Sequence, residues 1–113
     1  MKVLVLDDGR KQADSIKDAF SKKKMDAIVC SSSNEFLDAL NTPKFEAIYI
    51  NADTWNKGRR IYDYFGAGRR FEGKPAVIYN ADEKFAAISN RTPGEQDRLI
   101  RQPSNYETAL EEV

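Results

Sequence analysis

The chain has 113 residues, so one domain is the expectation, and a hydrophobic content of 41% is enough to build one core. Lysine plus arginine equals aspartate plus glutamate, so the net charge gives no support for a nucleic-acid or membrane partner. The absence of histidine excludes imidazole metal ligands and every histidine-based catalytic dyad or triad, and the single Cys30 excludes an internal disulfide.

No segment of the sequence marks the chain for export or for a membrane. The apolar start at residues 1–6 is too short for a signal peptide, and two aspartates follow it at once. No apolar stretch reaches the length that a helix needs to cross a bilayer. Cys30 is expected to be a small buried hydrophobe, which suits a reducing compartment. We therefore expect a cytoplasmic protein.

Short apolar runs alternate along the chain with segments whose apolar residues recur at helical spacing. A run that is apolar at every position indicates a strand covered on both faces, as in a parallel sheet between helices. Five strands alternating with five helices predict a single doubly wound (βα)5 domain over residues 1–113. We choose the flavodoxin-like strand order 2-1-3-4-5. The predicted strands cover residues 3–6, 27–30, 47–50, 75–79 and 99–100.

Several predicted helices carry end signals. The lysines at residues 22–24 close the first helix, where cations complement the helix dipole. A phosphate-binding patch is the alternative interpretation of this run. Ser32 with Glu35, and Ser104 with Glu107, have the spacing of a capping box, which predicts a helix start at each place.

Three further features concern helices. The spacing predicts one helix from Trp55 to Gly66 and a short one over residues 82–88. In the last predicted helix, apolar residues still recur at helical spacing at Val113, as they would in a domain excised from a longer protein.

Polar residues stand where the predicted strands end. In an open α/β sheet the carboxyl ends of the strands line the crevice that holds ligands and chemistry. Asn51 should lie at the floor of that crevice, and its amide cannot act as a nucleophile or general base, as a carboxylate could. The strand ends in question are Asp7-Asp8, Asn51, Asn80-Ala81 and Gln102-Pro103.

In the order of these strand ends, the whole chain resembles the receiver domain of two-component response regulators, the chemotaxis-regulator-like (CheY-like) family. In that family the first strand ends in an acidic pair that binds magnesium, and the third ends in an aspartate that accepts a phosphoryl group from a histidine kinase. The fourth ends in Thr or Ser followed by Ala, and the fifth in Lys-Pro. Asp7 and Asp8 match the acidic pair, Ala81 matches the alanine, and Pro103 matches the proline.

The departures from the family pattern decide the function that we expect. Asn51 stands in place of the acceptor aspartate, which removes the nucleophile and one negative magnesium ligand. Gln102 replaces the lysine, Asn80 replaces the hydroxyl, and Leu99 stands at the family's aromatic switch position. The resemblance therefore implies a non-enzymatic pseudo-receiver that has lost aspartyl phosphorylation. It would act as a phosphorylation-independent protein-interaction and regulatory module of bacterial two-component signalling.

A residual magnesium-dependent phosphoacceptor is one alternative. No cofactor is expected, because Asp7 and Asp8 without a third anion would hold Mg²⁺ only weakly. Asp53 is the acid that could replace the missing acceptor. It lies two residues past the predicted strand end, so we expect a loop acid near the next helix start.

A small-ligand sensor is the second alternative, with Asn51, Asn80 and Gln102 as uncharged hydrogen-bond partners. For the main hypothesis the resemblance implies a protein partner on the face of the fourth helix, fifth strand and fifth helix. That face corresponds to residues 82–88 and 98–113, and a second copy of the chain is one candidate partner. We expect no membrane partner, and nucleic acid only through an attached domain.

Overall fold

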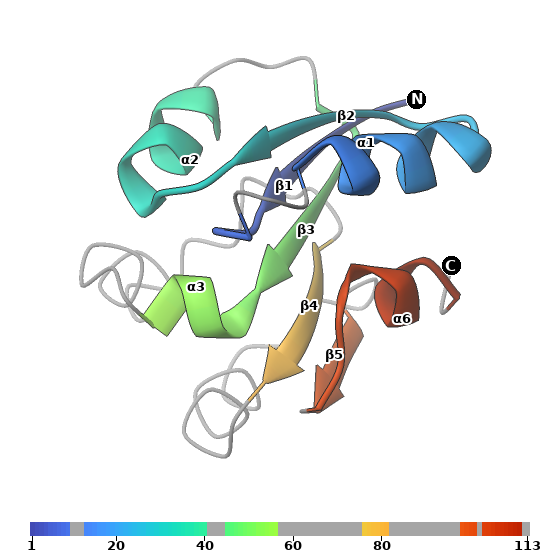
Figure 1. The fold of residues 1–113 in the computed structure, drawn as a ribbon. Coiled ribbons are helices and arrows are strands. Elements are labelled where there is room, and N and C mark those ends of the chain that lie inside the picture. The colour runs from blue at the N-terminus through green and yellow to red at the C-terminus, as the bar shows by residue number, and fades with distance from the viewer. Residues whose placement is uncertain (10–12, 41–44, 57–75, 82–97, 102, 112–113) are drawn as a thin grey trace.

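The computed structural model describes residues 1–9, 13–40, 45–56, 76–81, 98–101 and 103–111, which form an α/β fold (Figure 1). The helix predicted over residues 82–88 lies outside these residues. So does the part beyond Asn56 of the helix that was predicted from Trp55 to Gly66. Among the helices described, none is long and apolar enough to cross a membrane. The strands are β1 (Lys2–Leu6), β2 (Asp26–Cys30), β3 (Ala47–Asn51), β4 (Ala76–Ala81) and β5 (Arg98–Arg101). The helices are α1 (Ala13–Lys22), α2 (Ser33–Leu40), α3 (Ala52–Asn56) and α6 (Tyr106–Glu111).

The strands form one sheet in the order β2-β1-β3-β4-β5, and every neighbouring pair is parallel. The predicted architecture and strand order are therefore confirmed. Residues 3–6 of β1 and 47–50 of β3 are buried without interruption, because helices cover both faces of these inner strands. Since the strands are parallel, their carboxyl ends meet at one edge of the sheet, toward the lower left of Figure 1.

One hydrophobic core lies on each face of the sheet. Phe36 of α2 and Trp55 of α3 belong to the first core, and Phe20 of α1 and Leu110 of α6 belong to the second (Figure 1). Successive strand residues enter opposite cores, as the two-residue period of a strand requires. The strands contribute Leu4, Leu6, Ile48, Ile50 and Ile78 to the first core, and Val3, Val5, Tyr49, Val77 and Tyr79 to the second.

Cys30 ends β2 within the first core and is 5% exposed. Burial raises the pKa of its thiol to about 11, and the negative charge of Glu35 acts in the same direction. A thiol that stays protonated at neutral pH is a poor nucleophile. The prediction of a small buried hydrophobe is confirmed.

A left-handed residue terminates α1. Lys24 has φ 62°, its N–H donates to the Ser21 carbonyl, and the N–H of Met25 donates to the Phe20 carbonyl. This pair of bonds is a Schellman motif, and the contact that accompanies it buries Met25 in the core that holds Phe20. The lysine run therefore closes the helix as predicted, with Lys22 in the last turn.

The predicted capping boxes have different outcomes. Ser32 accepts the Glu35 N–H through Oγ at 3.2 Å, so the predicted start of α2 is confirmed. At α6 the cap lies one residue later than predicted. Asn105 Oδ1 accepts the N–H groups of residues 107 and 108, and the Thr108 hydroxyl accepts the Asn105 N–H in return. The prediction of Ser104 as that cap was wrong, because Asn105 fills the position with a reciprocal partner of its own.

Candidate functional site

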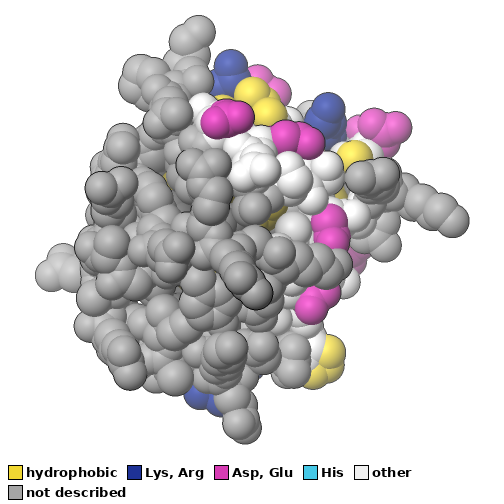
Figure 2. All heavy atoms as spheres, turned by 90° about the vertical axis from the view of Figure 1, so that its left-hand side faces the viewer, with side chains coloured by type: hydrophobic (Ala, Val, Ile, Leu, Met, Phe, Trp, Pro, Cys, Tyr) yellow, Lys and Arg dark blue, Asp and Glu magenta, His cyan; other side chains and the backbone are white. Residues whose placement is uncertain are grey.

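The sheet register brings the ends of β1, β3 and β4 to the same level. Leu6 pairs with Ile50, so Asp7 and Asn51 come next on their strands, and Asn51 is the register partner of Tyr79. Figure 2 views the molecule from the side toward which the strands point, and acidic side chains lie along the described part of that face. The predicted clustering of Asp7, Asn51 and the end of β4 thus follows from the register.

Asp7 is buried, and both of its carboxylate oxygens accept hydrogen bonds from the chain. The Tyr79 hydroxyl donates to Oδ2 at 2.6 Å, and the Gly9 N–H donates to Oδ1 at 3.0 Å. Asp7 is 7% exposed and Tyr79 is fully buried. A short O–H···O⁻ bond to an ionised acceptor is stronger than a bond between neutral groups, especially away from water. The tyrosine therefore compensates for much of the cost of burying this carboxylate.

Tyr79 is held in its protonated form. Its pKa is raised far above the ordinary value, first by burial and then by the adjacent negative charge of Asp7. The hydroxyl is consequently a permanent donor near neutral pH.

Asp8 is half-buried and has a hydroxyl partner as well. Thr54 Oγ1 donates to Asp8 Oδ1 at 3.0 Å and accepts the Asp8 backbone N–H, also at 3.0 Å. Thr54 is buried in α3 and is 3% exposed. Both acids of the pair thus bond to a buried hydroxyl from another element of the fold.

Asn51 has a structural partner at the start of α3. Its Oδ1 accepts the backbone N–H of Asp53 at 3.0 Å, which satisfies one of the free N–H groups of the first helical turn. Asp53 itself is exposed and lies in that first turn. Asp53 was predicted to be a loop acid near the helix start; its place near the helix start is confirmed, but it lies within α3 because the helix begins at Ala52.

The end of β4 turns through a left-handed residue. Asn80 has φ 57°, a conformation that asparagine adopts more readily than most residues, and its N–H donates to Ser104 Oγ at 2.5 Å. The pairing of β4 with β5 is irregular between Ile78 and Ala81. Ala81 is buried in the first core. Ser104 therefore joins the end of β4 to the segment before α6.

The fifth strand end is only partly within the described residues. Pro103 is exposed, and the backbone of Leu99 pairs with that of Ile78. Gln102 and the side chain of Leu99 lie outside the described residues, so their assignment to the pocket and to the switch position stays a prediction.

The residues present are a poor fit to the magnesium ion that the receiver fold implies. Mg²⁺ requires octahedral oxygen ligands and is bound in proteins through carboxylates. Here Asp7 accepts a hydrogen bond from the Tyr79 hydroxyl, and Asp8 accepts one from the Thr54 hydroxyl. The side-chain oxygen of Asn51 accepts an N–H of the first turn of α3. Across the described ranges, no three acidic, cysteine or histidine side chains are grouped so that they could hold a metal ion.

Sequence reasoning missed three residues of the site: Tyr79, Thr54 and Ser104. Tyr79 was assigned only to a strand, Ser104 only to a cap, and Thr54 was given no role, yet each supplies a hydroxyl to a strand end. A signal existed for Tyr79, because a buried tyrosine needs a partner for its O–H and the parity of β4 directs it to the same face as Asp7. Identifying that partner requires the register between strands.

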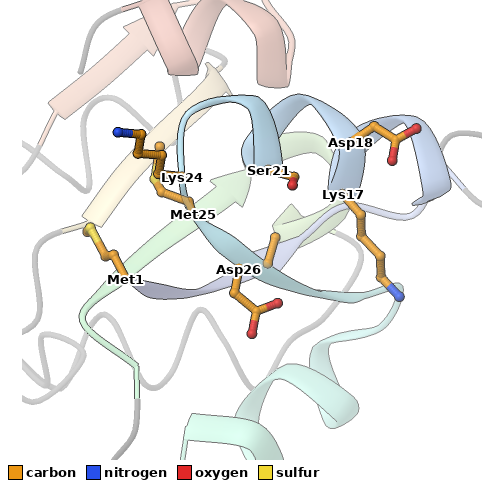
Figure 3. Close-up of a pocket in the computed structure, with 8 residues that line it drawn as sticks. Met1, Lys17, Asp18, Ser21, Lys24, Met25 and Asp26 are labelled. Atoms are coloured by element: carbon orange, nitrogen blue, oxygen red, sulfur yellow. The ribbon is translucent and has the colours of Figure 1, made fainter.

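A separate hollow of about 440 Å³ lies at the amino ends of β1 and β2, where Met1 and Asp26 form part of its lining (Figure 3). It is thus at the opposite edge of the sheet from the candidate site. Figure 3 shows the Lys17 and Lys24 side chains directed to different sides of this hollow. Of the lysine run at residues 22–24, Lys24 alone is in the lining of this hollow, so the hollow does not support the phosphate-patch interpretation of that run.

Comparison with solved structures identifies the fold. A two-component response regulator from Clostridium difficile superposes with a TM-score of 0.66 at 16% identity, covering 100% of this chain and 92% of that one. A response regulator from Thermotoga maritima gives 0.67 at 19% identity, covering 99% and 92%. This chain therefore has the fold of response-regulator receiver domains.

A third similar structure is the receiver domain of a sensor histidine kinase from Pseudomonas aeruginosa, which has a magnesium ion coordinated in its active-site cleft. It gives a TM-score of 0.66 at 10% identity, covering 97% of this chain and 91% of that one. No family model and no curated protein matches the sequence. At such identities the likeness concerns the fold, and the site must be judged from its own residues.

Proposed function

We propose that this chain is a receiver-like regulatory module that works by binding a protein partner and does not undergo aspartyl phosphorylation. It is a non-enzymatic signalling domain in this proposal, and its compartment is the cytoplasm. The receiver-domain fold supports the signalling role. The chemistry of the strand ends supports the loss of phosphorylation.

The observation that carries the proposal is the hydrogen bond from the Tyr79 hydroxyl to Asp7 Oδ2. A buried carboxylate needs a charge partner or strong donors, and in a phosphorylating site a metal ion and a cation would supply them. Here an uncharged hydroxyl of the chain stabilises the carboxylate from within the fold. The acid therefore has a partner in the resting protein without a metal ion.

Asn51 supports the same conclusion. An amide cannot form an acyl phosphate, because it has no carboxylate oxygen that could attack phosphorus. Its oxygen accepts the N–H of Asp53 instead and so contributes to the start of α3. The position has a structural role that does not involve phosphoryl transfer.

The partner surface in this proposal is the face of the fourth helix, fifth strand and fifth helix. The described part of this face consists of β5 and α6, with Arg101, Glu107 and Glu111 exposed. Charged side chains at the rim of an interface act mainly on partner choice and association rate.

Treatment with acetyl phosphate and magnesium, read by intact mass, tests the proposal. The parent chain should not gain the mass of a phosphoryl group, whereas a response regulator with its acceptor aspartate, treated in parallel, should. Acid-labile, hydroxylamine-sensitive adducts are not expected on any residue. A hydroxylamine-sensitive adduct that peptide mapping places on Asp7, Asp8 or Asp53 would overturn the proposal, and an adduct on Asp53 would establish the phosphoacceptor alternative.

A further inference from the structure

A groove of about 610 Å³ runs between α1 and α6, which lie on the same face of the sheet (Figure 1). Its floor is apolar: Tyr106 and Leu110 are almost fully buried there, and Ala19 is half-buried. Its other lining residues are exposed and mostly charged. They are Ser15, Asp18, Lys22 and Lys23 on the α1 side, and Glu107 and Glu111 on the α6 side.

The two sides of the groove differ in charge. The α1 side has two lysines and one aspartate, and the α6 side has two glutamates and no cation among its lining residues. Each helix follows a strand of the same parallel sheet, so α1 and α6 run in the same direction (Figure 1). Lys22 and Glu111 are the last residues of their helices and therefore lie toward the same end of the groove.

We propose that a second copy of this chain docks on the groove, with a two-fold axis parallel to the groove. Such an axis places the α1 side of one copy against the α6 side of the other. Residues at the same level along the groove then face each other. Lys22 and Lys23 of one copy then face the partner's Glu111, and the reciprocal pairs form by symmetry. A two-fold axis perpendicular to the groove, in the plane of the interface, would set α6 antiparallel to the partner's α6 and bring Glu107 opposite the partner's Glu111, so the charge pattern selects the first arrangement.

The same geometry sets the strength of the dimer. Toward the start of α6, Asp18 of one copy faces the partner's Glu107, which is a like-charge contact. The floor residues are already buried within each copy, so the apolar area gained on association is small. Attraction between exposed charges is weak and is screened by salt. The dimer is therefore a weak one that forms at low ionic strength.

Sedimentation velocity over a range of concentrations, at low and high salt, tests this proposal. The parent should pass from monomer to dimer with concentration at low salt and stay monomeric at high salt. Lys22→Glu and Glu111→Lys should each weaken the dimer by about tenfold or more, because each reversal turns two symmetric attractions into repulsions. The double variant K22E/E111K should recover the dimer, since the pairs are restored with their signs exchanged.

Two further variants separate this face from a general effect of charge. Lys17→Glu makes the same charge reversal on an exposed residue of α1 that does not line the groove, and it should leave the dimer unchanged. Asp18→Asn removes the like-charge contact and should tighten the dimer. Circular dichroism and urea melts would verify that each variant is folded.

A parent that stays monomeric at every concentration would overturn the proposal. A dimer that resists both single reversals, or one that K22E/E111K does not restore, would also overturn it, because another face would then hold the copies together. The inference does not depend on the proposed function. Dimerisation is measured without a phosphodonor, so a chain that acetyl phosphate labels could still dimerise, and an unlabelled one could stay monomeric.

Discussion

At the scale of single residues, the site is organised by hydroxyl groups that bond to carboxylates. Tyr79 reaches Asp7 from β4, and Thr54 reaches Asp8 from α3, so each acid is connected to a different element of the fold. Leaving a buried acceptor without its donor costs more than the hydrogen bond itself contributes. These contacts therefore stabilise the sheet edge and, at the same time, satisfy the groups that a cation would otherwise bind.

Tyr79→Phe should lower the free energy of unfolding at neutral pH by about 1–3 kcal/mol, because it leaves Asp7 Oδ2 buried without this donor. The matched control is Tyr49→Phe. Tyr49 is also buried, and within the described residues its hydroxyl donates to the sulfur of Met25 at 3.9 Å, a weak acceptor. Urea melts should show a smaller loss for the control. Equal losses would mean that the bond to Asp7 has no special weight.

The difference in stability between the parent and Tyr79→Phe should depend on pH, because the pKa of Tyr79 is raised in the folded protein. Folding favours the protonated phenol, so its contribution is complete below the pKa of a tyrosine in the unfolded chain, about 10. The contribution is lost as pH rises from there toward the higher pKa of the folded protein. The stability advantage of the parent over Tyr79→Phe should therefore be constant near neutrality and narrow at alkaline pH. An advantage that widens with pH would contradict the assignment.

The residues at the strand ends show how far sequence reasoning reaches. The positions of Asp7, Asp8 and Asn51 at one edge could be predicted, since each follows directly from where an apolar run stops. Their partners could not, because the Tyr79 contact depends on the β3–β4 register and the Thr54 contact on how α3 packs. The roles of Asn80 and Gln102 stay predictions.

At the scale of secondary structure, the helix ends are decided by competition between neighbouring residues. Ser32 caps α2 as its spacing predicts, but at α6 the adjacent Asn105 takes the cap position, and Ser104 binds the Asn80 N–H instead. The spacing rule allowed either residue. The tertiary contact to the end of β4 accounts for the role of Ser104. Strands were easier to predict than helix caps, because a strand that is buried on both faces appears in the sequence as a run of apolar residues.

The end of α1 offers a test at the same scale. Lys24 occupies a left-handed conformation that strains a residue with a Cβ atom, at about 1 kcal/mol. Lys24→Gly should therefore raise the free energy of unfolding by about that amount, as measured by urea denaturation. Lys23→Gly, one residue earlier, is the control and should not stabilise, since Lys23 is not among the described residues with positive φ. If both changes act alike, the Schellman motif does not explain the helix end.

At the scale of the whole molecule, the chain has the receiver-domain fold, and we propose that the chemistry at its strand ends differs from that of phosphorylated receivers. The two cores and the strand order need only buried apolar positions, which the sequence supplies throughout the inner strands. Phosphoryl transfer needs particular side chains at the ends of those strands, and these can change without affecting the cores. The fold was therefore predictable from periodicity, and the activity had to be judged residue by residue.

In the proposed function, the Tyr79 hydroxyl binds Asp7, the acid that a magnesium ion would need, and a magnesium titration tests this directly. Trp55, the only tryptophan, follows Thr54 and is buried, so its fluorescence can report on the site. The titration would compare the parent, Asn51→Asp, Tyr79→Phe and the double variant N51D/Y79F.

We expect no saturable change for the parent at millimolar magnesium and weak binding for Asn51→Asp. The double variant should bind more tightly than the two single changes together predict, because they act on one group of charges. Saturable binding by the parent below millimolar magnesium, abolished by Asp8→Asn, would show that the Tyr79 hydroxyl does not keep magnesium from this site.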